Sequence, residues 1–407
     1  MMHVRHWAVT VAVACMLAVP VWAEEIPRAK PEAVGMSGER LAKVTSTVQK
    51  MVDDEKIAGA ITVVARKGRI VHFETCGLRD VDGKKPVTQD TIMRFYSMSK
   101  PITTVAAMIL YDEGRFKLDD PVEKHVPELK GLEVYGDDGP VAARRKVTIR
   151  DLMRHTSGLT YGIFGNTPVD QMYRKNEMLG SRDLQVMVEK LGRIPLLYQP
   201  GTHWHYGVST DVLGCLVEKV SGKRLDAFFR ERILEPLDMR DTAFFVPKAK
   251  VDRFASCYSP GPDGLKVRDK YTDSRYLILP TLLSGGGGLV STARDYMRFC
   301  QMLLRRGELF GVRVLEAQTV DEMTKNQLPK GVHWGGNNGF GLGFSVRLRD
   351  DGAKAHGGEY GWGGAASTHF WISPKDDLAV VALSQLMPFS PQLQDAVKPL
   401  VYEAIEN

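Results

Sequence analysis

The sequence has little cysteine, no long run of charge of one sign, no internal repeat and no flexible linker. Its net charge of +5 is spread along the chain, which does not favour nucleic acid or an anionic membrane as the main partner. Hydrophobic residues make up 43% and charged residues 25% of the chain, which excludes disorder as the main state. A chain of 407 residues can bury an ample core, so composition indicates a soluble globular protein of enzyme size.

Long hydrophobic segments are missing as well, and the one marked apolar run, in the first 23 residues, is short. Arg5 precedes an apolar run over residues 7–19, and the small residue Ala23 stands before two glutamates. This order predicts a signal peptide cleaved after Ala23, and therefore a periplasmic or secreted protein. The run is too short for a stable transmembrane span. A retained anchor and a lipoprotein modified at Cys15 are the alternatives.

The few cysteines do not form a recognisable framework. Four of the five lie beyond residue 23, at wide spacings and without a Cys-x-x-Cys pair. An even number permits disulfides in an oxidising compartment. A core of this size does not need them, so we expect buried free thiols. The four are Cys76, Cys215, Cys257 and Cys300.

Strand-like segments gather at both ends of the chain, with helical segments between them. The strand candidates are 61–65, 69–73, 340–346, 369–372 and 378–383. The helix candidates include one capped by Ser37, one that follows Ser97, and 148–155, 181–191, 209–220, 225–234 and 294–305, with an amphipathic helix at the end of the chain. This order does not fit alternating β-α-β units. We predict an α+β fold, in which residues of about 24–114 and 285–407 build one antiparallel sheet flanked by helices. Residues of about 115–284 form a mostly helical lobe, and the site lies in the cleft between the two parts.

One Ser-x-x-Lys sequence occurs, formed by Ser97 and Lys100. It follows an expected strand and opens a helix, in which Pro101 suits an early turn. A spacing of three places both side chains on one helix face. A hydroxyl beside an amine becomes a nucleophile when the amine takes its proton, and the free N–H groups of a helix N-terminus suit an oxyanion. The alternative is a capping serine beside a surface lysine.

A tyrosine and two histidines stand together in segment 200–214. A turn delivers Tyr206 just before an expected helix, where its phenol could relay protons between a nucleophile and a leaving group. A packing tyrosine is the alternative. His203 and His205 form a His-x-His pair, but no third histidine, matching carboxylate or Glu-containing helix motif accompanies them. We therefore expect no metal and no other cofactor.

A glycine-rich segment runs from His356 to Ala365, just before a strand expected around Phe370. Glycines let a substrate lie close against an edge strand, whose N–H can complete an oxyanion hole. A plain glycine turn is the alternative. The other glycine run, 285–288, is not followed by Lys-Ser or Lys-Thr, so it is not a phosphate loop.

Taken in this order, the three segments resemble the serine β-lactamase and penicillin-binding-protein superfamily, and most of all its class C-related branch with the family VIII carboxylesterases. The likeness covers nearly all of residues 24–407. It also includes segments 118–122, 148–159, 211–214 and 370–374. The resemblance implies a single catalytic domain of the β-lactamase/transpeptidase-like fold.

The resemblance also implies roles for single residues. Ser97 would be the acylated nucleophile, Lys100 its base, and Tyr206 a partner of Lys100 in proton transfer. The backbone N–H groups of Ser97 and Ala365 would hold the oxyanion. The reaction would be acyl transfer in two steps, with an ester on Ser97 that is released to water or to another acceptor.

Two positions depart from the lactamase pattern. Val208 stands two residues after the tyrosine, where lactamases have Asn. In place of Lys-Thr-Gly stands Trp362-Gly363-Gly364, as in the family VIII esterases, and His356-Gly357-Gly358 is a second candidate for this motif. In either case the cation that grips a β-lactam carboxylate is missing or weakened. An aromatic ring in its place favours neutral, apolar acyl groups.

We therefore expect a serine hydrolase that acts on small to medium carboxylic esters. An amide hydrolase, either a β-lactamase or a D-amino-acid peptidase, is the alternative that the export signal favours, because cell-wall substrates lie outside the inner membrane. A non-catalytic sensor on the same fold is a third possibility. The expected partner is a small-molecule ester or amide, with no nucleic acid and no stable membrane insertion.

Overall fold

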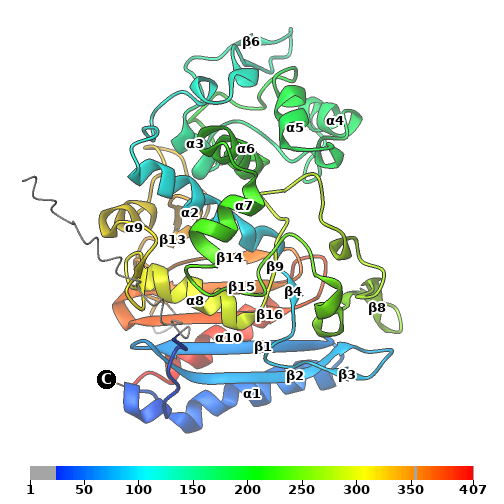
Figure 1. Ribbon diagram of the computed structural model, residues 1–407, viewed down its shortest axis with the longest axis vertical. Helices are drawn as coiled ribbons and strands as arrows, with labels where there is room; N and C mark the ends of the chain where they lie inside the picture. Colours follow the sequence, from blue (N-terminus) through cyan, green and yellow to red (C-terminus); the bar gives the residue numbers. More distant parts are fainter. Residues whose placement is uncertain (1–23, 353–354, 407) are drawn as a thin grey trace, which may run out of the picture.

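One antiparallel sheet of eight strands joins the two ends of the chain, and Figure 1 shows the blue and the orange-to-red strands side by side. The computed structural model describes residues 24–352 and 355–406, so the predicted signal peptide lies outside the described residues. The strand order is β12-β13-β14-β15-β16-β1-β2-β3. The strands are β1 (Gly59–Arg66), β2 (Arg69–Asp80), β3 (Lys85–Pro86), β12 (Asn338–Phe340), β13 (Ser345–Arg347), β14 (Tyr360–Gly364), β15 (Thr368–Ser373) and β16 (Leu378–Ser384).

Helices cover both faces of this sheet. Helix α8 (Ala293–Leu304) packs on one face, while α1 (Gly38–Asp53) and α10 (Gln392–Glu403) pack together on the other. All eight residues of β1 are buried, as expected for a strand with helices on both sides. Ser37 accepts a hydrogen bond from the Arg40 N–H and caps α1, which stabilises a helix by about 1 kcal/mol.

The middle of the chain builds the helical lobe above the sheet in Figure 1. Its centre is α2 (Ser99–Asp112), which lies before the expected start of the lobe at about residue 115. This helix is buried from Ser99 to Leu110 and packs against α6 (Ser209–Ser221). The other α-helices are α3 (Ile149–Met153), α4 (Pro168–Lys175), α5 (Leu184–Leu191), α7 (Leu225–Phe229) and α9 (Ala317–Met323). Short strand pairs complete the fold: β4 (Met93–Arg94) with β9 (Val290–Ser291), β5 (Glu133–Val134) with β6 (Val141–Ala142), β7 (Cys257–Gly261) with β8 (Gly264–Asp269), and β10 (Glu308–Leu309) with β11 (Val312–Arg313).

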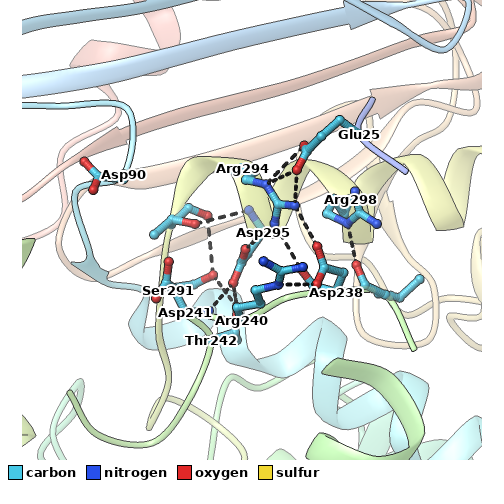
Figure 2. Close-up of polar contacts among 12 residues, drawn as sticks. Glu25, Asp90, Asp238, Arg240, Asp241, Thr242, Ser291, Arg294, Asp295 and Arg298 are labelled. Carbon is cyan, nitrogen blue, oxygen red and sulfur yellow. Dashed lines mark hydrogen bonds and ion pairs between the residues drawn. The ribbon is translucent and has the colours of Figure 1, made fainter. Parts of the chain in front are cut away.

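The first described residues are tied to α8 (Figure 2). The Arg298 guanidinium donates to the Glu24 carbonyl at 2.7 Å. Figure 2 shows Arg294 paired with Glu25 and with Asp238. Next to them the buried Asp295 carboxylate accepts hydrogen bonds from the Asp241 N–H and from a Thr242 hydroxyl. Glu24 and Glu25 are exposed, and these contacts tie the segment that follows residue 23 to the surface of the fold.

The predicted α+β arrangement is confirmed, and so are the four buried free thiols at Cys76, Cys215, Cys257 and Cys300. One strand prediction is wrong. Segment 340–346 forms a hairpin of β12 and β13 instead of one strand, because Gly343 adopts a φ of +86° that reverses the chain. None of the described helices is long and apolar enough to cross a membrane.

Candidate active site

Ser97 lies at a sharp turn between strand β4 and helix α2. Tyr96, just before it, has a φ of +44°, a conformation that non-glycine residues rarely adopt and that often marks functional sites. The Lys100 side chain is 1% exposed, and its Nζ lies 3.3 Å from Ser97 Oγ. The predicted pairing of hydroxyl and amine is therefore present, although Ser97 lies in the 3-10 turn Tyr96–Met98 and only Lys100 lies in α2.

The Lys100 amine is surrounded by neutral groups. Besides Ser97 Oγ, its Nζ donates to the Tyr161 hydroxyl at 2.8 Å and to the Gly286 carbonyl at 2.7 Å. Within the described part of the chain, no carboxylate forms an ion pair with it. An amine in contact with a serine hydroxyl is the arrangement by which an adjacent base activates a nucleophile.

Tyr206 is the second residue whose side chain contacts the Ser97 hydroxyl. Its hydroxyl donates to Ser97 Oγ at 2.7 Å, and the Lys100 Nζ lies 4.5 Å from the centre of its ring. Tyr206 stands in the turn before α6, as the sequence indicates. Ser97 Oγ therefore contacts two groups that can move protons, one on the side of Lys100 and one on the side of Tyr206.

Tyr161 is a site residue that the sequence reasoning missed. Its ring lies 5.2 Å from the Tyr206 ring, and burial raises the pKa of its phenol well above the ordinary value, so it stays protonated. The signal in the sequence is weak: a tyrosine followed by Gly162, just after the 148–159 segment. In the structure Gly162 has a φ of +76°.

The glycine run 285–288 forms a wall over Lys100. Asp211 on α6 accepts hydrogen bonds from the Ser284 hydroxyl and the Gly286 N–H, which fixes the carbonyl that Lys100 contacts. A Cβ on Gly286 would lie 2.6 Å from an Asp211 oxygen, so only glycine fits here. The run thus serves to position the lysine.

Aromatic rings pack around Tyr206. The rings of His155, Trp362 and Trp204 lie 5.0, 5.6 and 6.0 Å from it. Burial holds the pKa of His155 well below its usual range, so this imidazole is neutral. The rings fix the orientation of the tyrosine without adding charge.

A cavity of about 710 Å³ opens from Ser97 along strand β14. Trp362, Gly363, Gly364 and Ala365 line it, together with four large apolar side chains. A Cβ on Gly364 would lie 2.2 Å from the Phe95 carbonyl oxygen, so glycine is what allows the end of β14 to approach the nucleophile turn. The apolar residues are Ile163, Phe164, Trp334 and Phe389.

The structure therefore brings together most of the predicted site, but not His356. The His356 imidazole does not line the cavity and instead lies 3.4 Å from an Asp376 carboxylate oxygen and 3.7 Å from one of Asp350. Of the two candidates for the third motif, Trp362-Gly363-Gly364 is the one beside Ser97. Val208 is buried, with no exposed surface.

The two histidines of segment 200–214 have other neighbours. The His203 ring stacks on Tyr198 at 4.3 Å, and His205 lies 5.3 Å from the same ring. No group of three or more His, Cys, Asp or Glu side chains that could hold a metal occurs among the described residues. The chemistry that the arrangement supports is nucleophilic attack by a serine, with an amine and a phenol as proton carriers.

Comparison with known proteins gives a consistent picture. The family model described as Beta-lactamase matches residues 44–400. Protein Rv1367c of Mycobacterium tuberculosis is 34% identical over 84% of this chain and 89% of its own length, and Esterase EstB of Burkholderia gladioli is 28% identical over 90% and 97%. The solved structure of EstCE1, described as a hydrolase with promiscuous acyltransferase activity, superimposes with a TM-score of 0.79 at 27% identity, covering 89% of this chain and 99% of that one.

Proposed function

Because the chain belongs to the beta-lactamase family, we propose that it is a serine hydrolase that cleaves carboxylic esters through an acyl-enzyme on Ser97. The observation that carries this proposal is the pair of hydrogen bonds that Lys100 and Tyr206 make to Ser97 Oγ, at 3.3 and 2.7 Å, at one end of an aromatic-lined cavity.

The first half of the reaction forms the acyl-enzyme. Lys100 takes the proton of Ser97 Oγ, and the oxygen attacks the ester carbonyl carbon. The N–H groups of Ser97 and Ala365 stabilise the resulting oxyanion. Tyr206 gives a proton to the departing alkoxide, which leaves as the alcohol, and Lys100 returns a proton to the phenolate.

The second half releases the acid. A water molecule loses a proton to the same pair of groups and attacks the acyl carbonyl. Ser97 Oγ leaves with the proton, and the enzyme returns to its starting state. Each cycle consumes one ester and one water and yields one acid and one alcohol.

An ester is preferred over a β-lactam because of what lies next to the nucleophile. Trp362 and Trp334, 5.4 Å apart, present apolar rings in the part of the cavity beside Ser97. The cations that line the cavity, Arg347 and Lys398, belong to β13 and α10. Rings of this kind stabilise neutral apolar groups by burial, at about 25 cal/mol per Å² of apolar surface.

The test compares Ser97→Ala with Ser99→Ala, a nearby buried serine whose hydroxyl accepts from the Leu289 N–H. With p-nitrophenyl butyrate, we expect the wild type and Ser99→Ala to release nitrophenol and Ser97→Ala to be inactive, with the acyl mass adduct present only when Ser97 is intact. Equal rates for wild type and Ser97→Ala would refute the proposal. Turnover of nitrocefin or D-Ala-D-Ala peptides in preference to esters would favour the amide-hydrolase alternative. A stable adduct with no turnover of any substrate would favour a sensor.

Acyl transfer to an alcohol is a second candidate function. Phe164 and Phe389 line the cavity but are 71% and 50% exposed, so an apolar acceptor alcohol would cover them. Addition of butanol to the butyrate assay should then yield butyl butyrate at the expense of butyrate. Release of free acid alone would exclude this activity.

We also propose that the protein is exported after cleavage behind Ala23. The contacts of Glu24 and Glu25 with Arg298 and Arg294 support this, because they tie the residues just after the cut to the surface of the fold. The exported protein should therefore begin at Glu24, which intact-mass measurement would check.

A further inference from the structure

The cavity does not end at the aromatic rings but continues to a polar region next to helix α10. Strand β13 pairs with β14 only at Tyr360 and Gly361, so the edge of β14 from Trp362 to Gly364 is unpaired and the cavity extends around it. Side chains alternate along a strand, and on the α10 side Gly361 and Gly363 present none. These two glycines leave room beneath α10, and we call this end the polar chamber. It is lined by Arg347, Glu359, Trp371, Gln394 and Lys398.

Two N–H donors in the polar chamber have no acceptor. Trp371 is 1% exposed, and its indole Nε1 makes no hydrogen bond within the described part of the chain. Arg347 Nε is likewise buried without a partner there. Trp362 Nε1, on a residue that lines the same cavity, has no partner among the described residues either. Buried polar groups in folded proteins are almost always paired, so unpaired donors around one cavity indicate an acceptor that comes from outside the chain.

The charges in the chamber favour an acceptor that is an anion. Two cations, Arg347 and Lys398, face one carboxylate, Glu359, which is already satisfied by Lys398 and by the Tyr402 hydroxyl. The partner of Arg347 is Asp351, at 3.2 Å, which is 59% exposed and therefore screened by water. Burial lowers the pKa of Lys398 and Glu359 opposes that shift, so a second anion would stabilise the charged amine.

The position of the chamber assigns it to the leaving-group half of a substrate. Ala365, at the oxyanion just after β14, and Gly361, at the chamber, are four residues apart, or about 13 Å at about 3.3 Å per residue. Tyr206, which protonates the leaving alkoxide, packs on Trp362 between these points. A substrate that follows the unpaired edge of β14 from Ser97 and passes around it to the α10 face therefore directs its alcohol half toward Arg347 and Lys398.

We propose that the polar chamber binds a carboxylate at the far end of the alcohol half, so that preferred substrates are esters of long ω-hydroxycarboxylic acids. This inference rests on the proposed esterase function. The aromatic part of the cavity holds the apolar chain, and Arg347, Lys398 and the Trp371 N–H hold its terminal carboxylate.

The experiment measures kcat/KM for 10-acetoxydecanoate and for its primary amide, which has a similar shape but no charge. Charged hydrogen bonds of this kind give discrimination of about 10- to 100-fold, so the wild type should prefer the carboxylate by at least about tenfold. Because the ratio compares two substrates on one protein sample, it does not depend on how much of a variant folds.

Variants then locate the preference. Arg347→Gln should bring the ratio close to one, and Trp371→Phe, which keeps a ring but removes the N–H, should lower it several-fold. Arg349→Gln is the matched control, because Arg349 is exposed and does not line the cavity. Equal rates for the two substrates in the wild type, or a preference unchanged in both variants, would overturn the inference. If p-nitrophenyl butyrate is hydrolysed in that case, the proposed function stands; if no ester is hydrolysed, that function fails as well.

Discussion

Replacing each of the two site tyrosines by phenylalanine separates proton transfer from positioning. Tyr206→Phe removes the hydroxyl that lies 2.7 Å from Ser97 Oγ but keeps the ring that packs on Trp362. A positioned general acid or base contributes about 10²- to 10⁴-fold, so we expect acylation to slow by that factor. Tyr161→Phe removes a hydrogen bond of 2.8 Å to the Lys100 amine. A hydrogen bond contributes about 0.5–1.5 kcal/mol net, which corresponds to about 2- to 13-fold in rate.

The assay uses stopped flow to measure the rate of single-turnover acylation by p-nitrophenyl butyrate at saturating substrate. Tyr258→Phe is a suitable control, because this buried tyrosine accepts a hydrogen bond from the Val81 N–H and does not line the cavity. A Tyr206→Phe variant within about threefold of the wild type would refute its role in proton transfer, because the contribution expected of a general acid or base is at least about 10²-fold. A larger loss of acylation rate in Tyr161→Phe than in Tyr206→Phe would instead assign proton transfer to Tyr161 and positioning to Tyr206.

Other variants test stability and the approach of strand β14. Burial raises the pKa of Asp295 to about 6 in the folded state, so the fold favours the protonated acid and stability falls as pH rises from about 4 to about 6. Asp295→Asn should therefore stabilise the protein at pH 7 by up to about 3 kcal/mol and lose this advantage below about pH 4, as measured by urea unfolding at both pH values. Burial lowers the pKa of His72 to about 4, so its contribution is complete above about pH 6.5 and is lost as pH falls toward about 4; His72→Gln should flatten this part of the pH–stability curve. Gly364→Ala should reduce kcat at least tenfold and also lower the stability by about 1–3 kcal/mol, because its Cβ would lie 2.2 Å from the Phe95 carbonyl oxygen and displace β14 from the nucleophile.

Site residues that lie close together in the sequence, or next to a recognisable helix, could be predicted from the sequence. Ser97 and Lys100 are three residues apart, so local spacing suffices to pair them, and Tyr206 stands in a turn before a recognisable helix. The sheet could be predicted for a similar reason, since its central strands are continuous apolar runs. Short elements without such a run could not be predicted. The sequence predicts one strand where β12 and β13 form a hairpin, because only Gly343 marks the turn between them.

Contacts that depend on the approach of distant segments could not be predicted in this way. Tyr161 contacts Lys100 across 61 residues, and Gly286 contacts it across 186. The choice between His356 and Trp362 depends on which residue faces the cavity. That choice is made by the pairing of β14 with β15, where Trp362 lies opposite Phe370, and not by the glycines that follow both candidates.

The glycines of β14 explain why an aromatic residue suits this site. Gly364 lets the strand end approach the nucleophile turn, and Gly361 and Gly363 remove side chains on the face toward α10, so the strand is bare where a substrate would lie along it. A bare strand edge supplies only backbone hydrogen bonds and cannot by itself select a substrate. Selection must then come from the side chains beside it, which are aromatic near Ser97 and charged near α10. Such a division favours a substrate that is apolar at the scissile bond and polar at its far end.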